Sequence, residues 1–396
     1  MCGIAGIYGV SDKTLVKRMC DKIIHRGPDE DGYYVDGNVS LGMRRLSIID
    51  LSTGSQPVFN EDESIVVVFN GEIYNFKELR EELEQKGHRF STNSDTEVIV
   101  HAYEDYGYDC LRRFNGMFAI ALWDTKRKEL FLARDRIGIK PFYYTMIDES
   151  VVFASEIKSI LEYDEIKREV DEKALADYFI LRYVPAHLTM FKGIRKLEPG
   201  SYMVVNGNGM KRKKYWNLEC KPIHKNEAYF KENMLKMLKD SVKGRLIADV
   251  PLGVFLSGGV DSSTITAIAS DFSSEPVKTF SVGFYGAEYD ETPYARNVAE
   301  HFGTDHTEEW VDIENVDLLP KLIYHMDEPL ADPAILPTYL ISEVASKRVK
   351  VILSGEGGDE AFAGYDRYSS ELKAYNILRY FPNLLKKLVF KVGGGC

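Results

Sequence analysis

Two short segments in the second half of the chain constrain its fold most strongly, because each joins a strand, a glycine loop and an acidic residue. They read VFLSGGVDSS (residues 254–263) and VILSGEGGDE (residues 351–360). In both, an apolar run ends in Ser-Gly, and an aspartate follows further glycines where a helical pattern begins. Apolar strands alternating with helices predict a parallel, doubly wound α/β sheet. Ligands of such sheets bind beyond the carboxyl ends of the strands, where both loops would lie.

The two loops also indicate a site for a phosphate-bearing ligand and a metal ion. Glycines let backbone N–H groups wrap around an anion, and the helix N-terminus adds a favourable dipole. A carboxylate at that place would repel phosphate unless a cation lay between them, so Asp261 and Asp359 are candidate Mg²⁺ ligands. The alternative is two ordinary strand–helix turns in which each aspartate is an N-cap. The motif GxxxxGK[ST] is absent, so neither loop is a Walker A loop.

The first half of the chain has a different pattern. SIVVVFNGEIY (64–74) predicts a strand, and MFAIALWDTKRKELFLARD (117–135) predicts two strands around a polar turn. Two helices are expected to end at Gly87 and Gly107. Because strands and helices do not alternate regularly, we expect a layered α+β domain over residues 1–205. The glycine-containing, basic stretch 205–226 is interpreted as a connection to a second domain, residues 226–396.

Cysteine as the second residue raises the question of a nucleophile. If Met1 is removed, Cys2 carries a thiol and a free α-amino group on the same residue. A thiol reacts as the thiolate, and an α-amine with a reference pKa of roughly 7.7–8.0 could be its base. The alternative is that Cys2 lies in an ordinary buried first strand.

Two sets of motifs resemble known families. SGGVDSS resembles the PP-loop of the ATP pyrophosphatases, which cleave ATP between its α- and β-phosphates. MCGIAGIYG, HRGPD, RLSI, NGEIYN and SDTEVI follow one another as in the class II glutamine amidotransferase domain. Together they resemble the glutamine-hydrolysing asparagine synthetases. This resemblance implies an α+β N-terminal-nucleophile (αββα) domain and then an α/β doubly wound PP-loop domain, with ATP and Mg²⁺, glutamine and aspartate as its ligands.

The resemblance also implies roles for residues of the first domain. Cys2 would attack the side-chain amide of glutamine, and Asn70 with Gly71 would form the oxyanion hole. Arg45 would pair with the α-carboxylate of glutamine, and two acids would lie near its α-ammonium group. The implied glutamine-binding residues are Arg45, Leu46, Ser47, Ile48, Ile49, Asn70, Gly71, Glu72 and Asp95.

In the second domain, Glu356 matches an acid that would accept a proton when ammonia attacks aspartate activated as β-aspartyl-AMP. Asp261 and Asp359 match the carboxylates that hold Mg²⁺ on pyrophosphate. Another apolar residue, often leucine, is expected at Phe255, so this position departs from the family pattern. The implied ATP-binding residues are Phe255, Ser257, Gly258, Gly259, Asp261, Ser262, Val282, Ser354 and Gly355.

Other functions are open at this point. The chain could amidate a different carboxylate, or it could be a non-catalytic relic, although the intact nucleophile and acids argue against the latter. Full-length relatives continue past GGDEAFAGYDRY to a motif resembling ExRxPFLD that is absent here. We therefore expect a truncated chain that hydrolyses glutamine but makes little asparagine, with the apolar face of LLKKLVF (384–390) left exposed.

The composition excludes several classes of protein. A net charge of −11 argues against a general nucleic-acid binder. The five cysteines are scattered without CxxC spacing, which argues against a zinc site of that kind and a disulfide framework. No apolar run is long enough to span a membrane, and no signal peptide is evident, so we expect a cytoplasmic protein. The family is often dimeric, so the resemblance allows a homodimer.

Overall fold

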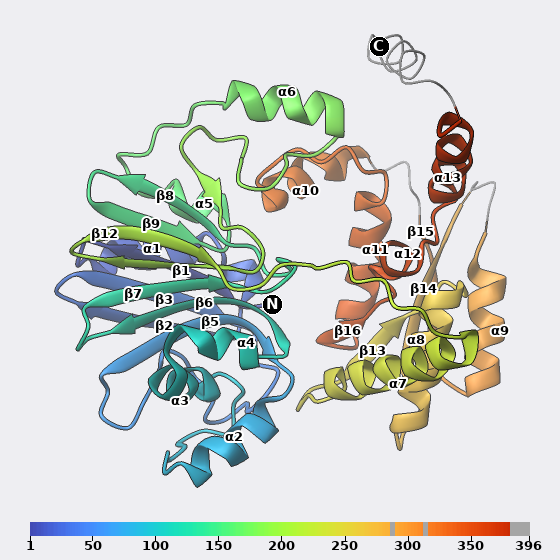
Figure 1. The fold of residues 1–396 in the computed structure, drawn as a ribbon, viewed down its shortest axis with the longest axis horizontal. Helices are drawn as coiled ribbons and strands as arrows, with labels where there is room; N and C mark the ends of the chain where they lie inside the picture. The colour runs from blue at the N-terminus through green and yellow to red at the C-terminus, as the bar shows by residue number, and fades with distance from the viewer. Residues whose placement is uncertain (286–289, 312–315, 381–396) are drawn as a thin grey trace. The chain divides into compact units, whose positions relative to one another are not determined.

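The computed structural model describes residues 1–285, 290–311 and 316–380 (Figure 1). The chain forms two compact units. The first comprises residues 1–252, 282–288 and 309–351, and the second residues 253–281, 289–308 and 352–396, each within the described ranges. Among the helices in these ranges, none is both long and apolar enough to cross a membrane.

Two antiparallel six-stranded sheets form the centre of the first unit. One has the order β10 (Arg195–Lys196), β8 (Tyr143–Ile147), β9 (Ser150–Ala154), β1 (Gly3–Tyr8), β3 (Val39–Arg45) and β2 (Glu30–Asp36). The other has the order β12 (Gly209–Lys214), β11 (Ser201–Asn206), β7 (Glu129–Arg134), β6 (Gly116–Asp124), β5 (Ile65–Ile73) and β4 (Val58–Phe59).

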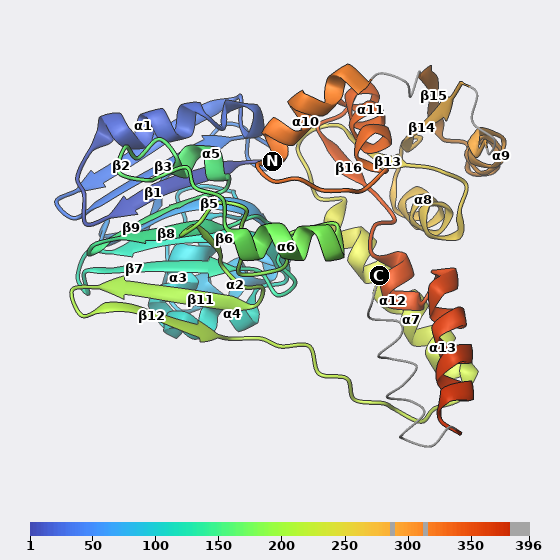
Figure 2. The same ribbon diagram turned by 90° about the horizontal axis from the view of Figure 1, so that it is seen from above.

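Alternation along the strands creates the layers of this unit, because successive side chains of a strand point to opposite faces. In β5, Val66 and Val68 pack in the core between the sheets, whereas Val67 and Phe69 pack under helices. These helices are α2 (Phe76–Gln85), α3 (Glu97–Tyr106) and α4 (Cys110–Arg113). On the other sheet, α1 (Lys13–Asp21) and α5 (Ile157–Ile160) cover the outer face, and Figure 2 shows α1 along it. The αββα prediction is confirmed.

Local signals place the helix ends where the sequence predicted them. Helix α2 ends just before Gly87, which has a φ of 104°, and α3 ends before Gly107, with a φ of 56°. The short 3₁₀ helix η2 (Gly107–Asp109) follows α3 directly, and another, η1 (Ile24–Arg26), follows α1. Glycine adopts positive φ values without steric cost, which explains why both helices stop there.

Part of the basic stretch predicted as a connection is a strand: residues 209–214 form β12, and only residues 215–226 run without a helix or strand to α7. Strand β12 pairs with β11 from Ser201 opposite Lys214 to Asn206 opposite Gly209, so the sheet extends beyond residue 205. Most side chains of β12 are exposed, and it lies at the edge of the sheet. Lysines and arginines on an edge strand keep it solvated and discourage pairing with another chain. The lack of apolar alternation hid this strand in the sequence.

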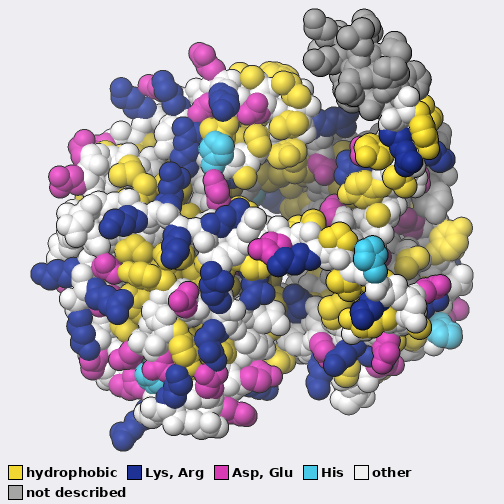
Figure 3. Space-filling model, viewed as in Figure 1, with side chains coloured by type: hydrophobic (Ala, Val, Ile, Leu, Met, Phe, Trp, Pro, Cys, Tyr) yellow, Lys and Arg dark blue, Asp and Glu magenta, His cyan; other side chains and the backbone are white. Residues whose placement is uncertain are grey.

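Further helices of the first unit lie outside the sandwich. They are α6 (Glu172–Leu181), α7 (Glu227–Arg245), η3 (Val316–Leu318), α10 (Leu319–Met326) and α11 (Ile335–Ser346). Leu322, Leu336 and Leu340 form a small core at α10 and α11. On α6, Phe179 and Ile180 are 76% and 77% exposed, and Figure 3 shows hydrophobic side chains gathered over this helix. The segment LLKKLVF lies outside the described residues.

A four-stranded sheet forms in the second half of the chain. Its order is β15 (Asp305–Val311), β14 (Lys278–Phe284), β13 (Leu252–Phe255) and β16 (Val351–Leu353), and β13 and β14 pair in parallel. Helix α8 (Val260–Phe272) follows β13, α9 (Thr292–Phe302) follows β14, and α12 (Gly358–Phe362) and α13 (Asp366–Leu378) follow β16. The predicted α/β order with parallel strands is confirmed.

Candidate active sites

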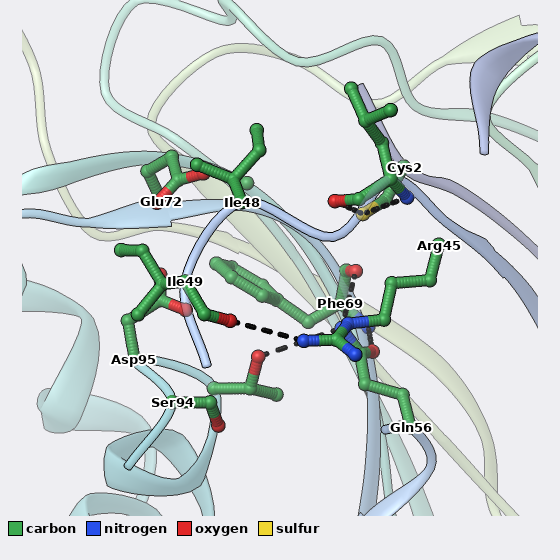
Figure 4. Close-up of a pocket in the computed structure, with 12 residues that line it drawn as sticks. Cys2, Arg45, Ile48, Ile49, Gln56, Phe69, Glu72, Ser94 and Asp95 are labelled. Atoms are coloured by element: carbon green, nitrogen blue, oxygen red, sulfur yellow. Dashed lines mark hydrogen bonds between the residues drawn. The ribbon is translucent and has the colours of Figure 1, made fainter. Parts of the chain in front are cut away.

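A small cavity in the first unit brings together Cys2, the loop after β3, the end of β5 and the start of α3. Its volume is about 20 Å³, so it holds roughly one water molecule as it stands. In Figure 4, Glu72, Ile49 and Asp95 lie on one side of this cavity, and Cys2 and Arg45 lie on the other. The lining residues are Cys2, Arg45, Leu46, Ile48, Ile49, Gln56, Phe69, Gly71, Glu72, Ser94, Asp95 and Thr96.

The thiol of Cys2 faces the loop after β3. Its Sγ lies 3.4 Å from the amide nitrogen of Leu46, which donates to it, and the Cys2 carbonyl accepts from Arg26 Nε at 3.0 Å. Burial raises the pKa of the Cys2 thiol, and the Leu46 N–H offsets this only in part. Burial also lowers the pKa of the Met1 amine to about 5. While Met1 is present, the Cys2 nitrogen is an amide and cannot act as a base.

Asn70 lies in the middle of β5 with its side chain fully buried. Neither its Oδ1 nor its Nδ2 has a hydrogen-bond partner among the described residues. A buried amide without partners costs free energy, and such groups are rare in folded proteins. At the next residue, a Cβ on Gly71 would come within 2.2 Å of the Met117 carbonyl oxygen, so only glycine fits. Within the described residues the Asn70 amide therefore has no hydrogen bond, and Asn70 itself is not among the residues that line the cavity.

The guanidinium of Arg45 is held by several acceptors. Nη1 donates to both oxygens of Glu30 at 3.0 and 3.2 Å, and Nη2 donates to the carbonyls of Ile49 and Asp50 at 3.0 and 2.7 Å. The amide of Ser47 donates to Asp29 at 2.9 Å, so this predicted residue shapes the loop and does not line the cavity. Glu30, the acidic partner of Arg45, was not anticipated from the sequence.

Glu72 and Asp95 form a pair of acids at the cavity. The Oδ2 of Asp95 accepts from the amide of Ile73 at 2.8 Å, and the N-cap of α3 is Thr96, so Asp95 does not cap the helix. Burial raises the pKa of both carboxyls, that of Asp95 to about 6, and the neighbouring Asp95 raises the pKa of Glu72 further. A bound cation would favour the ionised form of both acids.

Two further residues of this site carried no signal in the sequence. Lys140 is 3% exposed, and burial lowers its pKa while Glu72 and Cys2 act in the opposite direction. The side chain of Gln56 accepts from the amide of Phe69 at 2.7 Å and donates to its carbonyl at 3.2 Å, so it fixes β5 beside Asn70. Nothing local in one sequence distinguishes a buried lysine or glutamine from an exposed one.

The first glycine loop of the second unit joins β13 to α8. Gly258 has a φ of 80°, and a Cβ there would come within 2.5 Å of Tyr294. The hydroxyls of Ser257 and Ser262 lie 3.0 Å apart across the loop. The N-cap of α8 is Gly259, and Asp261 lies in the first turn of the helix. The N-cap alternative for Asp261 is therefore wrong.

The second glycine loop lies against Asp261. A Cβ on Gly358 would be 2.1 Å from Asp261 Oδ2, and one on Gly355 would be 2.9 Å from its Cβ. Asp359 occupies the first turn of α12, whose N-cap is Gly357, so it is not an N-cap either. Both aspartates are half-buried, and hard carboxylate oxygens of this kind suit Mg²⁺.

The remaining predicted residues of this region lie at the ends of strands. Phe255 ends β13, and Val282 lies two residues before the end of β14. Ser354 directly follows β16, and all three are half-buried. Glu356 is exposed in the loop between β16 and α12.

Comparisons with known proteins support both halves of this description. The chain matches a glutamine amidotransferase domain at residues 1–216 and an asparagine synthase domain at residues 233–392. It is 41% identical to asparagine synthetase [glutamine-hydrolyzing] 1 of Bacillus subtilis, over 99% of this chain and 63% of that protein. It is 38% identical to a putative asparagine synthetase [glutamine-hydrolyzing] 2 of Methanocaldococcus jannaschii, over 98% and 79% of the two chains.

The chain thus spans less than two thirds of the length of the Bacillus relative. Among solved structures, a glutamine phosphoribosylpyrophosphate amidotransferase from B. subtilis has a TM-score of 0.42 and 15% identity, over 79% of this chain and 91% of that one. That likeness is too distant to support a conclusion. The two domain matches and the identity to these relatives show that the chain belongs to the family of glutamine-hydrolysing asparagine synthetases.

Proposed function

We propose that this chain hydrolyses glutamine at Cys2 and uses the ammonia to convert aspartate to asparagine at an ATP-dependent site. The observation that carries the first half is the buried, unpaired amide of Asn70 in the strand that lines the Cys2 cavity. The observation that supports the second half is the contact of Asp261 with the other glycine loop.

Glutamine hydrolysis follows from the groups around Cys2. After removal of Met1, the α-amine of Cys2 takes the proton of the thiol. Burial lowers the pKa of the Met1 amine, and the same burial would keep the α-amine of Cys2 neutral, as a base must be. The sulfur then bonds to the side-chain amide carbon of glutamine. The carbonyl oxygen of that amide becomes an oxyanion, which would face Asn70 and the Gly71 N–H. The C–N bond breaks as the proton passes to the leaving ammonia. Water hydrolyses the resulting γ-glutamyl thioester.

Charged residues of the cavity would select the amino-acid end of glutamine. Arg45 would pair with the α-carboxylate of glutamine. For this, the Arg45 guanidinium would have to share with glutamine the N–H groups that it now donates to Glu30. Glu72 and Asp95 would accept the α-ammonium group, and its charge would lower the pKa of both acids. Since the cavity holds about one water, the lining side chains must move apart for glutamine to enter.

At the second site, the glycine loops would hold ATP. Ser257, Gly258, Gly259 and Ser262 would contact the phosphates, and Phe255, Val282, Ser354 and Gly355 would contact the rest of the nucleotide. Asp261 and Asp359 would hold Mg²⁺, which when bound offsets the phosphate charge. The β-carboxylate of aspartate attacks the α-phosphorus and pyrophosphate leaves. Ammonia then displaces AMP, with Glu356 as the proposed proton acceptor.

Mass spectrometry of the products from glutamine, aspartate, ATP and Mg²⁺ tests the proposal. Asparagine with equal amounts of AMP and pyrophosphate would support it. Glutamate without AMP would restrict the chain to a glutaminase. If AMP and glutamate form only when a carboxylate other than aspartate is supplied, that carboxylate is the acceptor.

We also propose that the protein works as a homodimer in the cytoplasm. Cys2, Cys20, Cys110 and Cys220 are free thiols, which suits a reducing compartment. Light scattering coupled to gel filtration measures the oligomeric state, and a monomer at working concentrations would contradict the dimer.

A further inference from the structure

Four side chains converge in the first unit at a place that shares no residue with the lining of the Cys2 cavity. They are Glu61, His88, His101 and Glu104, and their candidate ligand atoms all lie within 4.8 Å of one another. Glu61 lies in the turn between β4 and β5, and His88 follows α2. His101 and Glu104 are three residues apart in α3, a spacing that places both on one face of the helix.

His101 is the residue that points to a ligand. Its side chain is 0% exposed, and neither ring nitrogen has a hydrogen-bond partner among the described residues. The rings of His88 and Phe90 pack against its ring at 4.7 and 4.5 Å, and its two nitrogens face the carboxylates of Glu61 and Glu97 without a hydrogen bond to either. A fully buried imidazole without hydrogen bonds is costly, and a metal–nitrogen bond would remove part of that cost.

The distances around Glu61 suit a transition metal. One oxygen of Glu61 lies 3.2 Å from His88 Nδ1, and the other lies 3.4 Å from His101 Nδ1. In a tetrahedral zinc site with bonds of about 2.0–2.1 Å, neighbouring ligand atoms are separated by roughly 3.3–3.4 Å. These two pairs of donor atoms therefore already have nearly the separation that one ion would impose, and all four candidate ligand atoms lie within 4.8 Å of one another.

The second nitrogen of each histidine faces a carboxylate. His88 Nε2 lies 3.4 Å from Asp105 Oδ1, and His101 Nε2 lies 3.6 Å from Glu97 Oε1. Metal-bound histidines usually present their other ring nitrogen to a carboxylate or carbonyl, which fixes the ring and raises its basicity. Glu97 is itself held by the amides of Ser91 and Thr92, both at 2.7 Å.

We propose that Glu61, His88, His101 and Glu104 bind one divalent transition-metal ion of the Zn²⁺ class. Two imidazoles with two carboxylates favour zinc, cobalt or nickel over the oxygen-seeking Mg²⁺ and Ca²⁺. The acids Glu61, Glu97, Glu104 and Asp105 give the site negative charge, of which the ion pair between Lys86 and Asp105 offsets only part.

The role of the ion would be to join three segments of the first unit. It would link the β4–β5 turn and the segment after α2 to α3, the helix that follows Asp95 and Thr96 of the Cys2 cavity. His101 lies six residues beyond Asp95, about 9 Å along a helix. The ion would thus restrain the helix beside the cavity without touching it. This inference does not depend on the proposed function.

Metal content and stability of the tag-free 396-residue chain test the inference. The protein is stripped with a chelator and titrated with Zn²⁺ against a chromophoric competitor, and elemental analysis gives the stoichiometry. We expect one Zn²⁺ per chain, and at a hundredfold excess over Kd a rise in Tm of about 5 °C or more. X-ray absorption should show nitrogen and oxygen ligands. Sulfur ligands, or the absence of stoichiometric binding at micromolar Zn²⁺, would overturn the inference.

Substitutions locate the ion. His88→Gln and His101→Gln should each weaken Zn²⁺ binding at least tenfold and remove the zinc-dependent rise in Tm. His224→Gln, which changes an exposed histidine outside the cluster, should leave both unchanged. His88 is only half-buried, so its variant tests the site even if His101→Gln does not fold. Unchanged Zn²⁺ affinity in His88→Gln would show that the ion binds elsewhere and that the cluster is an ordinary hydrogen-bonded network.

Discussion

The cavity beside Cys2 and the glycine loops around Asp261 differ in how deeply their charged side chains are buried and in what those side chains contact. In the cavity, Arg45 is 4% exposed and paired with Glu30, and Glu72 and Asp95 have raised pKa values caused by burial. In the loops, Asp261 and Asp359 are half-buried and lie against glycine backbone. On the proposed function, the cavity would recognise its ligand mainly through buried charged side chains, whereas the loops would rely on backbone N–H groups and on a cation that arrives with the ligand.

Loss of the nucleophile should have the largest effect. Cys2→Ala, or retention of Met1, should lower glutamine-dependent turnover by about 10³-fold or more, because no other group can form the thioester. Ammonium-dependent activity, where present, should be unchanged. The release of glutamate from glutamine is the measurement, with Cys220→Ala, an exposed cysteine, as the matched control. Undiminished hydrolysis by Cys2→Ala would remove Cys2 from the mechanism.

Asn70→Ala should reduce kcat for glutamine hydrolysis by about 10²–10³-fold, as expected for an oxyanion donor. Its stability should change little, because no hydrogen bond to the side chain is lost. Gln56→Ala should show the opposite pattern, since it removes both bonds to the Phe69 backbone and costs about 1–3 kcal/mol. Activity assays and urea unfolding of the two variants separate these effects. A strongly destabilised Asn70→Ala would indicate a structural role.

In the glycine loops, Asp261→Asn or Asp359→Asn should lower ATP-dependent AMP formation by about 10²-fold or more. Each change keeps the shape of the side chain and removes the charge that would hold Mg²⁺. Glutamine hydrolysis should remain within twofold, because the two sites use different residues. Asp240→Asn, on the exposed part of α7, is the control. AMP formation at the unmodified rate would contradict the metal assignment.

A smaller effect is expected from pH. The α-ammonium of glutamine requires ionised acids, and the pKa of Asp95 is raised to about 6. As the pH falls below that value, kcat/KM for glutamine should therefore drop by up to about tenfold per unit. Glu72→Gln removes the repulsion between the acids, so the inflection should move to lower pH. If the pH inflection of kcat/KM is the same in Glu72→Gln as in the unmodified protein, it does not arise from the Glu72–Asp95 pair.

Much of the architecture was predictable because it rests on local signals. Alternating apolar residues identify strands such as β5, and positive-φ glycines end α2 and α3. The two segments with Ser-Gly, further glycine and aspartate mark the strand–loop–helix turns before α8 and α12. The motifs around Cys2 and Arg45 resemble those of a glutamine-binding site, and the structure brings residues of five separate segments together at one cavity.

The sequence by itself therefore determined the order of most elements and the two classes of domain, since these depend on neighbours along the chain, whereas the residues around the cavity were implied by the resemblance to a family. Only the tertiary structure decided which polar groups lost their partners or gained distant ones. Among the described residues it left the Asn70 and His101 side chains without hydrogen bonds, set His101 between the carboxylates of Glu61 and Glu97, buried Lys140 and paired Arg45 with Glu30. The physical reason is that burial and charge compensation depend on contacts between residues far apart in sequence, which no local pattern encodes.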